Sequence, residues 1–425
     1  MYAKSIQIYE FKCFEKANAE FRYPGEDNAI ERNNINLVLG DNGGGKSSLL
    51  KAIAIATLAP ALLEGGFVPY RLVRRDRAGR ATGDTLLKLV GVLDAEEERD
   101  ASIEAGKRRR VPDGQREFLA RVKSRERGND SLSLERTSET PISDLIHDDF
   151  SPSFFVVGYG ATRRVESEGY SESSSRKRRG RRYQRVASLF EDQVTLRPMQ
   201  SWLLRLSPSR KAECIELINS ALPDNIRFLG ELDEDEFLFE FDGVSTPYPA
   251  LSDGYRFFIG WIGDLVGQMN EVSPELPLKD LRGIVLVDEI DLHLHPSWQR
   301  DVVGRLSDTF PALQFVFTSH SPLVAASVRS DNVIVTGTSE NGTAILERMN
   351  ESLYGRGIES VLLSPYFGLD SARPAAEREI SQNLADAAAK SPDGGLNEAE
   401  EFLRRLAQPM EKLQARRPND RNNDA

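Results

Sequence analysis

A glycine-rich turn near the start of the chain has the residue types of a phosphate-binding loop. It follows the apolar run 36–39 and precedes a helix-forming segment. The turn consists of Gly40, Asp41, Asn42, Gly43, Gly44, Gly45, Lys46 and Ser47. Glycines let backbone N–H groups converge on phosphate oxygens, and the start of the next helix adds partial positive charge. The pattern predicts that Lys46 reaches the terminal phosphates and that the Ser47 hydroxyl is a Mg²⁺ ligand. Ser48 is a further candidate contact, although it also fits as an ordinary helix residue.

Two carboxylates end another apolar run. Residues 284–287 are followed directly by Asp288 and Glu289. A nucleoside-triphosphate hydrolase needs this arrangement opposite its phosphate loop: Asp288 can hold Mg²⁺, largely through water, and Glu289 can polarise the attacking water. Solvated acids at an ordinary strand end are the alternative, but the phosphate loop makes the catalytic interpretation the stronger one.

Two more segments have residue types that bind anions. Ser252, Asp253 and Gly254 open a helix, where a serine N-cap followed by small residues forms an anion site. His320 follows the apolar run 314–317, and a histidine at a strand tip can hydrogen-bond a γ-phosphate.

Metal binding by histidine or cysteine receives little support. His293 and His295 could be read as a metal pair, but no third His or Cys lies nearby, so we favour helix-start packing or an interface contact. Cys13 and Cys214 lie far apart in the chain, which argues against a disulfide scaffold and excludes a thiolate cluster.

The segments between these motifs predict an α/β protein. Short apolar or β-branched runs alternate with helix-length segments, which indicates a sheet that is at least partly parallel. Residues 226–229 and 237–241 flank an acidic turn and predict a hairpin. The other expected strands are 5–10, 36–39, 153–157, 284–287, 314–317 and 333–335.

Charge is unevenly distributed along the chain. The 425 residues carry a net charge of −11, which gives no overall attraction to nucleic acid. Residues 107–127 and 163–185 nevertheless each contain nine Lys or Arg against three acids. Solvated loops are the simpler interpretation of these basic stretches, and contact with nucleic-acid phosphates is the alternative.

The remaining composition sets the expected boundaries. Residues 96–149 lack a sustained apolar face and are interpreted as a charged insertion, with a flexible basic loop at 166–185. Residues 346–425 are expected to be a helical region with a polar tail. The longest apolar run, 52–63, is shorter than the ~20 residues of a membrane span. Because the chain also starts like a strand rather than a signal peptide, we expect a cytoplasmic protein without membrane contact.

The order of the motifs resembles the ABC-type ATPase family. Its members have a phosphate loop, an LSxG-like helix start, a strand ending in Asp-Glu, a D-loop and a switch histidine. Here 205 positions separate Ser47 from Ser252, 36 separate Ser252 from Asp288, and 32 separate Asp288 from His320. The last two spacings match a compact ABC head, whereas the first implies an insertion between its two lobes.

Details of the sequence place the resemblance in the SMC and RecF branch. Residues 8–14, IYEFKCF, look like the opening of that branch, in which a basic residue approaches the nucleotide, and this implies Lys12. Residues 251–255 read LSDGY rather than the LSGGQ of transporters. The glutamine that senses Mg²⁺ in the family is not assignable, because the nearest one downstream of the segment 158–164 is Gln184, beyond a low-complexity run.

The resemblance implies a fold, a reaction and partners. An ABC-type head of mixed sheet and helices would occupy residues 1–95 and 150–345, binding ATP and Mg²⁺ and hydrolysing ATP with Glu289 and His320. Two heads would sandwich two nucleotides in a homodimer or higher oligomer, so that Ser252 and Gly254 act on the facing loop.

Three segments point to a narrower relationship. GYGATRR at 158–164, ALSDGYR at 250–256 and VDEIDLHLHPSWQ at 287–299 look like ATP-binding proteins of bacterial defence islands, including Septu-type and retron-associated ATPases. That relationship implies an anti-phage role with an effector protein, a nuclease encoded nearby. A RecF-like repair ATPase that binds DNA through the basic stretches is the alternative, and the neighbouring genes would separate the two.

Overall fold

The computed structural model describes residues 1–27, 29–95, 97, 114–125, 129–134, 148–165, 180–192, 194–339, 341–348, 351–367 and 369. The chain divides into two compact units, Met1–Val361 and Leu362–Ala425. Of the second unit only 362–367 and 369 are described, so most of the predicted C-terminal helical region lies outside the described residues. The part of that region that is described includes the end of strand β16 and the short helix α9 (Ile358–Leu362).

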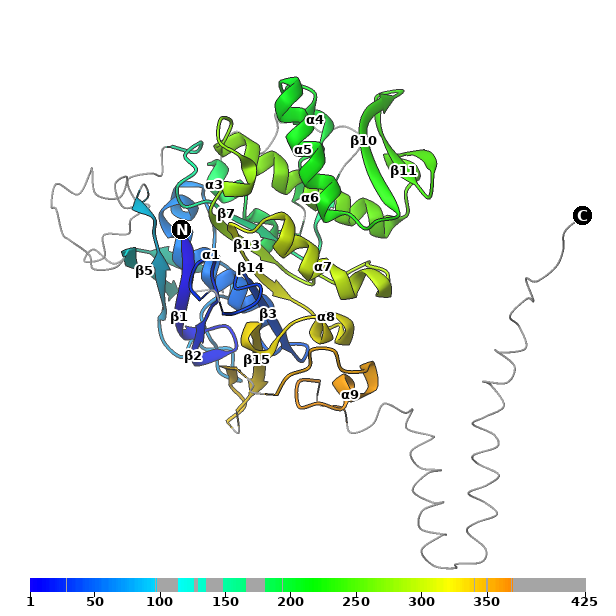
Figure 1. Cartoon of the computed structure of the whole chain (residues 1–425). Helices are drawn as coiled ribbons and strands as arrows, with labels where there is room; N and C mark the ends of the chain where they lie inside the picture. Colours follow the sequence, from blue (N-terminus) through cyan, green and yellow to red (C-terminus); the bar gives the residue numbers. More distant parts are fainter. Residues whose placement is uncertain are drawn as a thin grey trace, which may run out of the picture. The chain divides into compact units, whose positions relative to one another are not determined.

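A six-stranded mixed sheet forms the centre of the first unit (Figure 1). Its order is β16-β15-β3-β14-β13-β7, and all neighbours are parallel except β16, which pairs antiparallel with β15. The strands are β3 (Ile35–Gly40), β7 (Val156–Tyr159), β13 (Gly283–Val287), β14 (Leu313–Thr318), β15 (Val333–Thr338) and β16 (Ala344–Glu347). The predicted α/β fold with a partly parallel sheet is confirmed.

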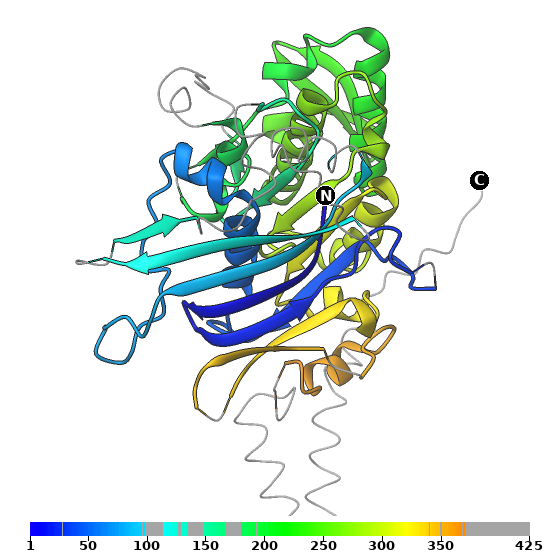
Figure 2. The same ribbon diagram turned by 90° about the vertical axis from the view of Figure 1, so that its left-hand side faces the viewer.

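A second sheet is entirely antiparallel, in the order β2-β1-β4-β5-β6. Its strands form the blue and cyan layer in Figure 2. They are β1 (Tyr2–Phe11), β2 (Phe14–Glu20), β4 (Thr85–Val92), β5 (Gln115–Ser124) and β6 (Asp130–Ser133).

Part of the predicted charged insertion belongs to this antiparallel sheet. Strand β5 pairs with the whole of β4 through residues 115–122, and Phe118, Ala120 and Val122 point into the core. The expectation that 96–149 has no apolar face is therefore wrong for 115–124. A strand with one buried face needs an apolar residue only at every second position, so charges on its outer face hide the pattern in the composition.

Helix α1 (Lys46–Glu64) lies between the two sheets (Figure 1). It contacts β1, β4, β5 and β6 on one side and β3, β7 and β14 on the other. Fourteen of its 19 residues are buried, so it is apolar around its circumference. Among the described residues it alone has the length and apolar composition of a membrane-spanning helix, and its position inside the core accounts for that composition.

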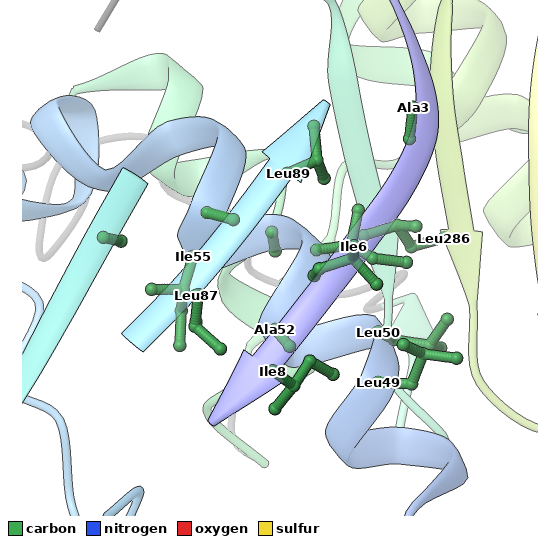
Figure 3. Close-up of a cluster of buried hydrophobic side chains, with 14 of the residues drawn as sticks. Ala3, Ile6, Ile8, Leu49, Leu50, Ala52, Ile55, Leu87, Leu89 and Leu286 are labelled. Atoms are coloured by element: carbon green, nitrogen blue, oxygen red, sulfur yellow. The ribbon is translucent and has the colours of Figure 1, made fainter. Parts of the chain in front are cut away.

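Figure 3 shows the packing around α1. Ile6 and Ile8 from β1, Leu87 from β4 and Leu286 from β13 point toward the helix, where Leu50 is among their neighbours. The core therefore joins both sheets through one helix.

Several further helices and a small sheet gather beyond β13, at one end of the first unit (Figure 1). Strands β10 (Ile226–Asp233), β11 (Glu236–Phe241) and β12 (Val244–Pro247) form an antiparallel sheet, which confirms the predicted hairpin. The other elements are α3 (Arg181–Gln184), α4 (Gln200–Leu203), α5 (Pro208–Ala221), α6 (Asp253–Val272), α7 (Pro296–Thr309), α8 (Pro322–Ala326), β8 (Arg164–Val165) and β9 (Thr195–Leu196).

The end of the predicted basic loop is not a solvated segment. Residues 166–179 lie outside the described residues, but Arg182 and Arg185 are only 1% and 3% exposed. Arg182 donates hydrogen bonds to backbone carbonyls, and Arg185 donates to the carbonyl of Asp149. The prediction of a flexible loop is therefore wrong for 180–185, because these guanidinium groups satisfy buried carbonyls rather than facing water.

Buried amide side chains hold the two sheets together. Asn36 on β3 accepts from the Arg22 N–H at 2.7 Å and donates to the carbonyls of Arg22 and Phe315 at 2.8 and 3.1 Å. Gln314 on β14 bonds both the N–H and the carbonyl of Ala3 at 2.7 Å. Since Ala3 and Arg22 belong to the antiparallel sheet and the segment that leaves it, these amides fix one sheet against the other.

Replacing one of these amides with an apolar side chain of similar size should destabilise the fold. Asn36→Leu leaves the Arg22 N–H without its acceptor, and we expect the free energy of unfolding to fall by about 2–4 kcal/mol. Urea denaturation measures the loss. Asn18→Leu is the control, because Asn18 is exposed on β2, and it should change stability by less than about 0.5 kcal/mol. Equal losses would contradict a specific role for the buried amide.

Candidate functional site

The glycine-rich turn connects β3 to α1 in a conformation that requires glycine. Gly40, Gly43 and Gly45 have φ of +136°, +82° and +102°. A Cβ at Gly40 would lie 2.2 Å from the Thr336 side-chain oxygen, and one at Gly45 would lie 2.5 Å from the Phe14 ring. The neighbouring strands thus hold a bare backbone at the start of α1, as a phosphate cradle needs.

Lys46 closes over this turn. Its ammonium group donates to the carbonyls of Gly40 and Asp41 at 2.7 and 2.9 Å. Burial lowers the pKa of Lys46, and nearby carboxylates act in the opposite direction. Those carboxylates are Asp288, Asp41, Glu289 and Asp291. The fold therefore brings the predicted lysine and the predicted acidic pair into one electrostatic environment.

The acidic pair follows β13, beside the end of β14. The Thr318 hydroxyl donates to an Asp288 carboxylate oxygen at 2.6 Å and accepts from the Glu289 N–H at 2.8 Å. Glu289 has φ of +50°, a left-handed conformation that is uncommon for glutamate and typical of functional sites. The described part of the chain offers the Glu289 carboxylate no hydrogen-bond or ion-pair partner. Its backbone is held while its side chain stays available.

Arg163 lies behind the acidic pair and is 4% exposed. It donates to the carbonyls of Asp288, Glu289 and Gly160 at 2.5, 2.9 and 3.2 Å. Burial lowers the pKa of Arg163 to about 10, so it remains a cation at neutral pH. The interpretation of the basic stretch 163–185 as a solvated loop is wrong for Arg163, because its guanidinium group bonds backbone carbonyls of the acidic turn and does not face solvent.

His320 follows β14 and is half-buried, without a hydrogen-bond partner for its ring among the described residues. The next residue, Ser321, donates from its hydroxyl to the Gln299 side chain at 2.7 Å. Gln299 in turn donates to the carbonyls of Leu294 and Asp291 at 2.9 and 3.4 Å. The segment after β13 and the segment after β14 are thereby linked, a contact that the sequence did not reveal.

The start of α6 carries the predicted anion-binding residues. Ser252 is its N-cap and is exposed, and Asp253 pairs with Arg256. A Cβ at Gly254 would lie 2.3 Å from the carbonyl oxygen of His293, whose ring stacks on Phe257 with centroids 4.5 Å apart. Gly254 is therefore required for close packing against the segment after the acidic pair, in addition to any role toward phosphate.

The two clustered histidines have structural contacts. His293 stacks on α6, and His295 is the N-cap of α7, where its Nδ1 accepts from the Ser297 N–H at 3.4 Å. Within the described ranges no group of three or more His, Cys, Asp or Glu side chains is arranged to hold a metal ion. Helix-start packing, the interpretation that we favoured from the sequence, is what these contacts show.

The turn between β1 and β2 packs on the phosphate loop. A Cβ at Gly45 would lie 2.8 Å from the Cys13 sulfur, and Cys13 also interacts with the Ser48 hydroxyl. Lys12 precedes Cys13 in this turn, with φ of +49°. Burial lowers the pKa of Lys12, and Lys51 lowers it further. Lys12 is thus near the loop in the fold, and Ser48 points to Cys13.

The donor set at these strand ends fits a nucleotide phosphate chain with Mg²⁺. Ser47 and Asp288 offer the hard oxygen ligands that Mg²⁺ prefers, and Lys46 with the start of α1 offers positive charge. Two buried oxygen atoms here, the Thr336 hydroxyl and Asp291 Oδ1, have no hydrogen-bond partner within the described residues. Ligands bind at the carboxyl ends of parallel strands because the polar groups that follow neighbouring strands converge there.

Removing the Thr318 hydroxyl should weaken the acidic turn. Thr318→Val keeps the shape but leaves the buried Asp288 carboxylate and the Glu289 N–H without a partner, so stability should fall by about 1–3 kcal/mol. Chemical denaturation measures this change in the free energy of unfolding. Thr57→Val is the matched control, because the buried Thr57 hydroxyl only duplicates a helix bond to Ile53, and it should cost less than ~1 kcal/mol. A similar loss in both would refute the supporting role of Thr318.

Comparison with solved structures finds SMC heads. The SMC head domain from Thermotoga maritima is 14% identical, with a TM-score of 0.45, over 83% of this chain and 100% of that chain. The SmcHead bound to the C-winged helix domain of ScpA is 15% identical, with a TM-score of 0.47, over 82% of this chain and 98% of that chain.

Curated relatives are Septu and retron proteins. Septu protein PtuA of Bacillus mycoides (strain KBAB4) is 28% identical over 88% of this chain and 46% of its own length. The "Retron Ec83 probable ATPase" of Escherichia coli is 40% identical over 23% of this chain and 18% of its own length. The resemblance inferred from the motifs is confirmed, although the chain spans less than half the length of these relatives.

A family match covers the site. The family described as "AAA domain, putative AbiEii toxin, Type IV TA system" matches residues 35–326, from the strand before the phosphate loop to the helix after His320. Because this region is more than half of the chain, the protein belongs to this AAA-domain family.

Proposed function

We propose that the protein binds ATP with Mg²⁺ and hydrolyses it to ADP and phosphate. The observation that carries the proposal is the juxtaposition of Lys46, in its glycine-rich loop, with the carboxylates that follow β13. The names of the retron relatives, which include the word ATPase, support it.

Each residue has a distinct part in this reaction. Lys46 and the backbone of 40–47 bind the phosphates, and Ser47 and Asp288 would hold Mg²⁺, which supplies charge neutralisation when bound. Glu289 orients and polarises the attacking water, since its carboxylate has no other partner among the described residues. His320 is placed to donate to the terminal phosphate. Catalysis consists of positioning and electrostatic stabilisation.

The proposal extends to assembly. Ser252 is exposed at the start of α6, as it must be if it acts with Gly254 on the nucleotide of a second copy in a head-to-head dimer. The relationship to Septu and retron proteins supports a role in bacterial anti-phage defence, in which ATP binding regulates a partner protein, a nuclease. We place this activity in the cytoplasm.

Direct DNA binding by a RecF-like protein is not favoured by the described residues. Arg163, Arg182 and Arg185, three cations of the second basic stretch, are buried on backbone carbonyls and cannot reach a nucleic acid. Of the first stretch, residues 107–113 and 126–127 lie outside the described residues, while Lys123 and Arg125 at the end of β5 are exposed.

Nucleotide binding is tested with Lys46→Ala. Loss of the buried ammonium removes a charged donor to the phosphates, so the Kd for fluorescent ATP should rise about 10- to 100-fold. Lys88→Ala is the control, because Lys88 lies on β4 and pairs with Glu117 away from the loop. Undiminished binding by Lys46→Ala would show that the loop does not bind the nucleotide.

The ATP-dependent dimer is tested with Glu289→Gln. The amide keeps the shape of the side chain but cannot polarise water, so ATP should persist and the mass in light scattering should double with ATP. Adding Ser252→Arg should restore the monomer by placing bulk and charge opposite the facing phosphates. A Glu289→Gln mass that does not respond to ATP would argue against a sandwich.

A further inference from the structure

We infer that Arg163 is a positioning residue that aims the Glu289 carboxylate for hydrolysis. The inference rests on the proposed ATPase activity and concerns the same site. One guanidinium group, that of Arg163, donates to two backbone carbonyls, those of Asp288 and Glu289.

Those two carbonyls belong to the two peptide planes that flank the Glu289 Cα. Since a peptide unit is planar, fixing both carbonyl oxygens fixes φ and ψ of the residue between them. The direction of the Cα–Cβ bond of Glu289 then follows, and with it the region that the carboxylate can reach. Arg163 reaches both planes because the guanidinium presents its N–H groups in a rigid fork.

Glu289 needs such support because its conformation is strained. At φ of +50° a glutamate has a sparsely populated backbone conformation, and such strain persists only if the surroundings hold it. The N–H groups of the turn are held separately: that of Asp288 donates to the Tyr159 carbonyl at 2.8 Å, and that of Glu289 donates to Thr318. Arg163 bridges the two carbonyls of the turn, and that of Glu289 also accepts from the Leu292 N–H at 3.1 Å.

The chain supplies a matched arginine for comparison. Arg182 is as deeply buried as Arg163 and also donates to three backbone carbonyls, those of Asp148, Ser153 and Phe154 at 3.0, 3.0 and 3.2 Å. None of its acceptors belongs to the phosphate loop or the acidic turn. Loss of Arg182 therefore measures what a buried, carbonyl-bonded arginine contributes to stability alone.

The experiment compares Arg163→Met, Arg163→Lys and Arg182→Met in the full chain. Melting temperature, Kd for fluorescent ATP, and single-turnover hydrolysis are measured for each at a temperature where all are folded. We expect Arg163→Met to bind ATP within about threefold of the parent protein and to hydrolyse it about 100-fold more slowly, as small displacements of a catalytic group do. Arg163→Lys should recover part of the rate, because one ammonium holds only one of the two planes.

The outcomes separate three conclusions. If Arg163→Met and Arg182→Met lose melting temperature alike but only the former loses rate, the positioning role stands. If both retain the parental rate, or if both lose it in proportion to stability, Arg163 has a structural role only and the inference is overturned. If the parent protein hydrolyses no ATP while Lys46 still governs nucleotide binding, the proposed hydrolysis fails first, and the inference that depends on it falls with it.

Discussion

Burial of α1 on all sides is the constraint on which the rest of the structure depends. A phosphate loop can bind only if its turn is held open, and here the turn leads directly into a helix that both sheets enclose. Any shift of α1 would disturb apolar contacts with β1 and β4 as well as with β3, so the helix start has one position. The buried amides of Asn36 and Gln314 add directional bonds to this packing and fix how the sheets face each other.

The site follows from the order of strands in the mixed sheet. Strands β3, β14, β13 and β7 are parallel neighbours, so the loop, His320, the acidic pair and Arg163 all follow carboxyl ends at one edge. Tyr159 at the end of β7 extends this arrangement to α6: its carbonyl accepts from the Asp288 N–H, and its hydroxyl donates to Asp264 at 2.9 Å. The acidic turn and helix α6 therefore share a buried neighbour.

The features that could be predicted from the sequence are those that depend only on neighbouring residues in the chain. The loop 40–47, the strand before Asp288 and the hairpin of β10 and β11 follow short patterns of turn and strand residues. Strand β5 was not predicted, because its buried apolar face and its charged outer face together give the segment a polar composition. The prediction that Arg163 and Arg182 face solvent was wrong for a related reason. The sequence shows the charge of these arginines, but the backbone carbonyls to which they donate come from segments distant in the chain.

The site contains two kinds of side chain, those available to a ligand and those that hold the backbone in place, and only the first kind could be recognised from the sequence. The Glu289 carboxylate and the His320 ring have no hydrogen-bond partner among the described residues, whereas Thr318, Arg163 and Gln299 are bonded to the segments that carry them. Side chains that meet a ligand must keep their bonding capacity until it arrives, so the backbone beneath them needs support from elsewhere. Short motifs reveal the ligand-facing side chains because each of these follows the end of a strand. The supporting groups come from other strands, and only the folded chain assembles them.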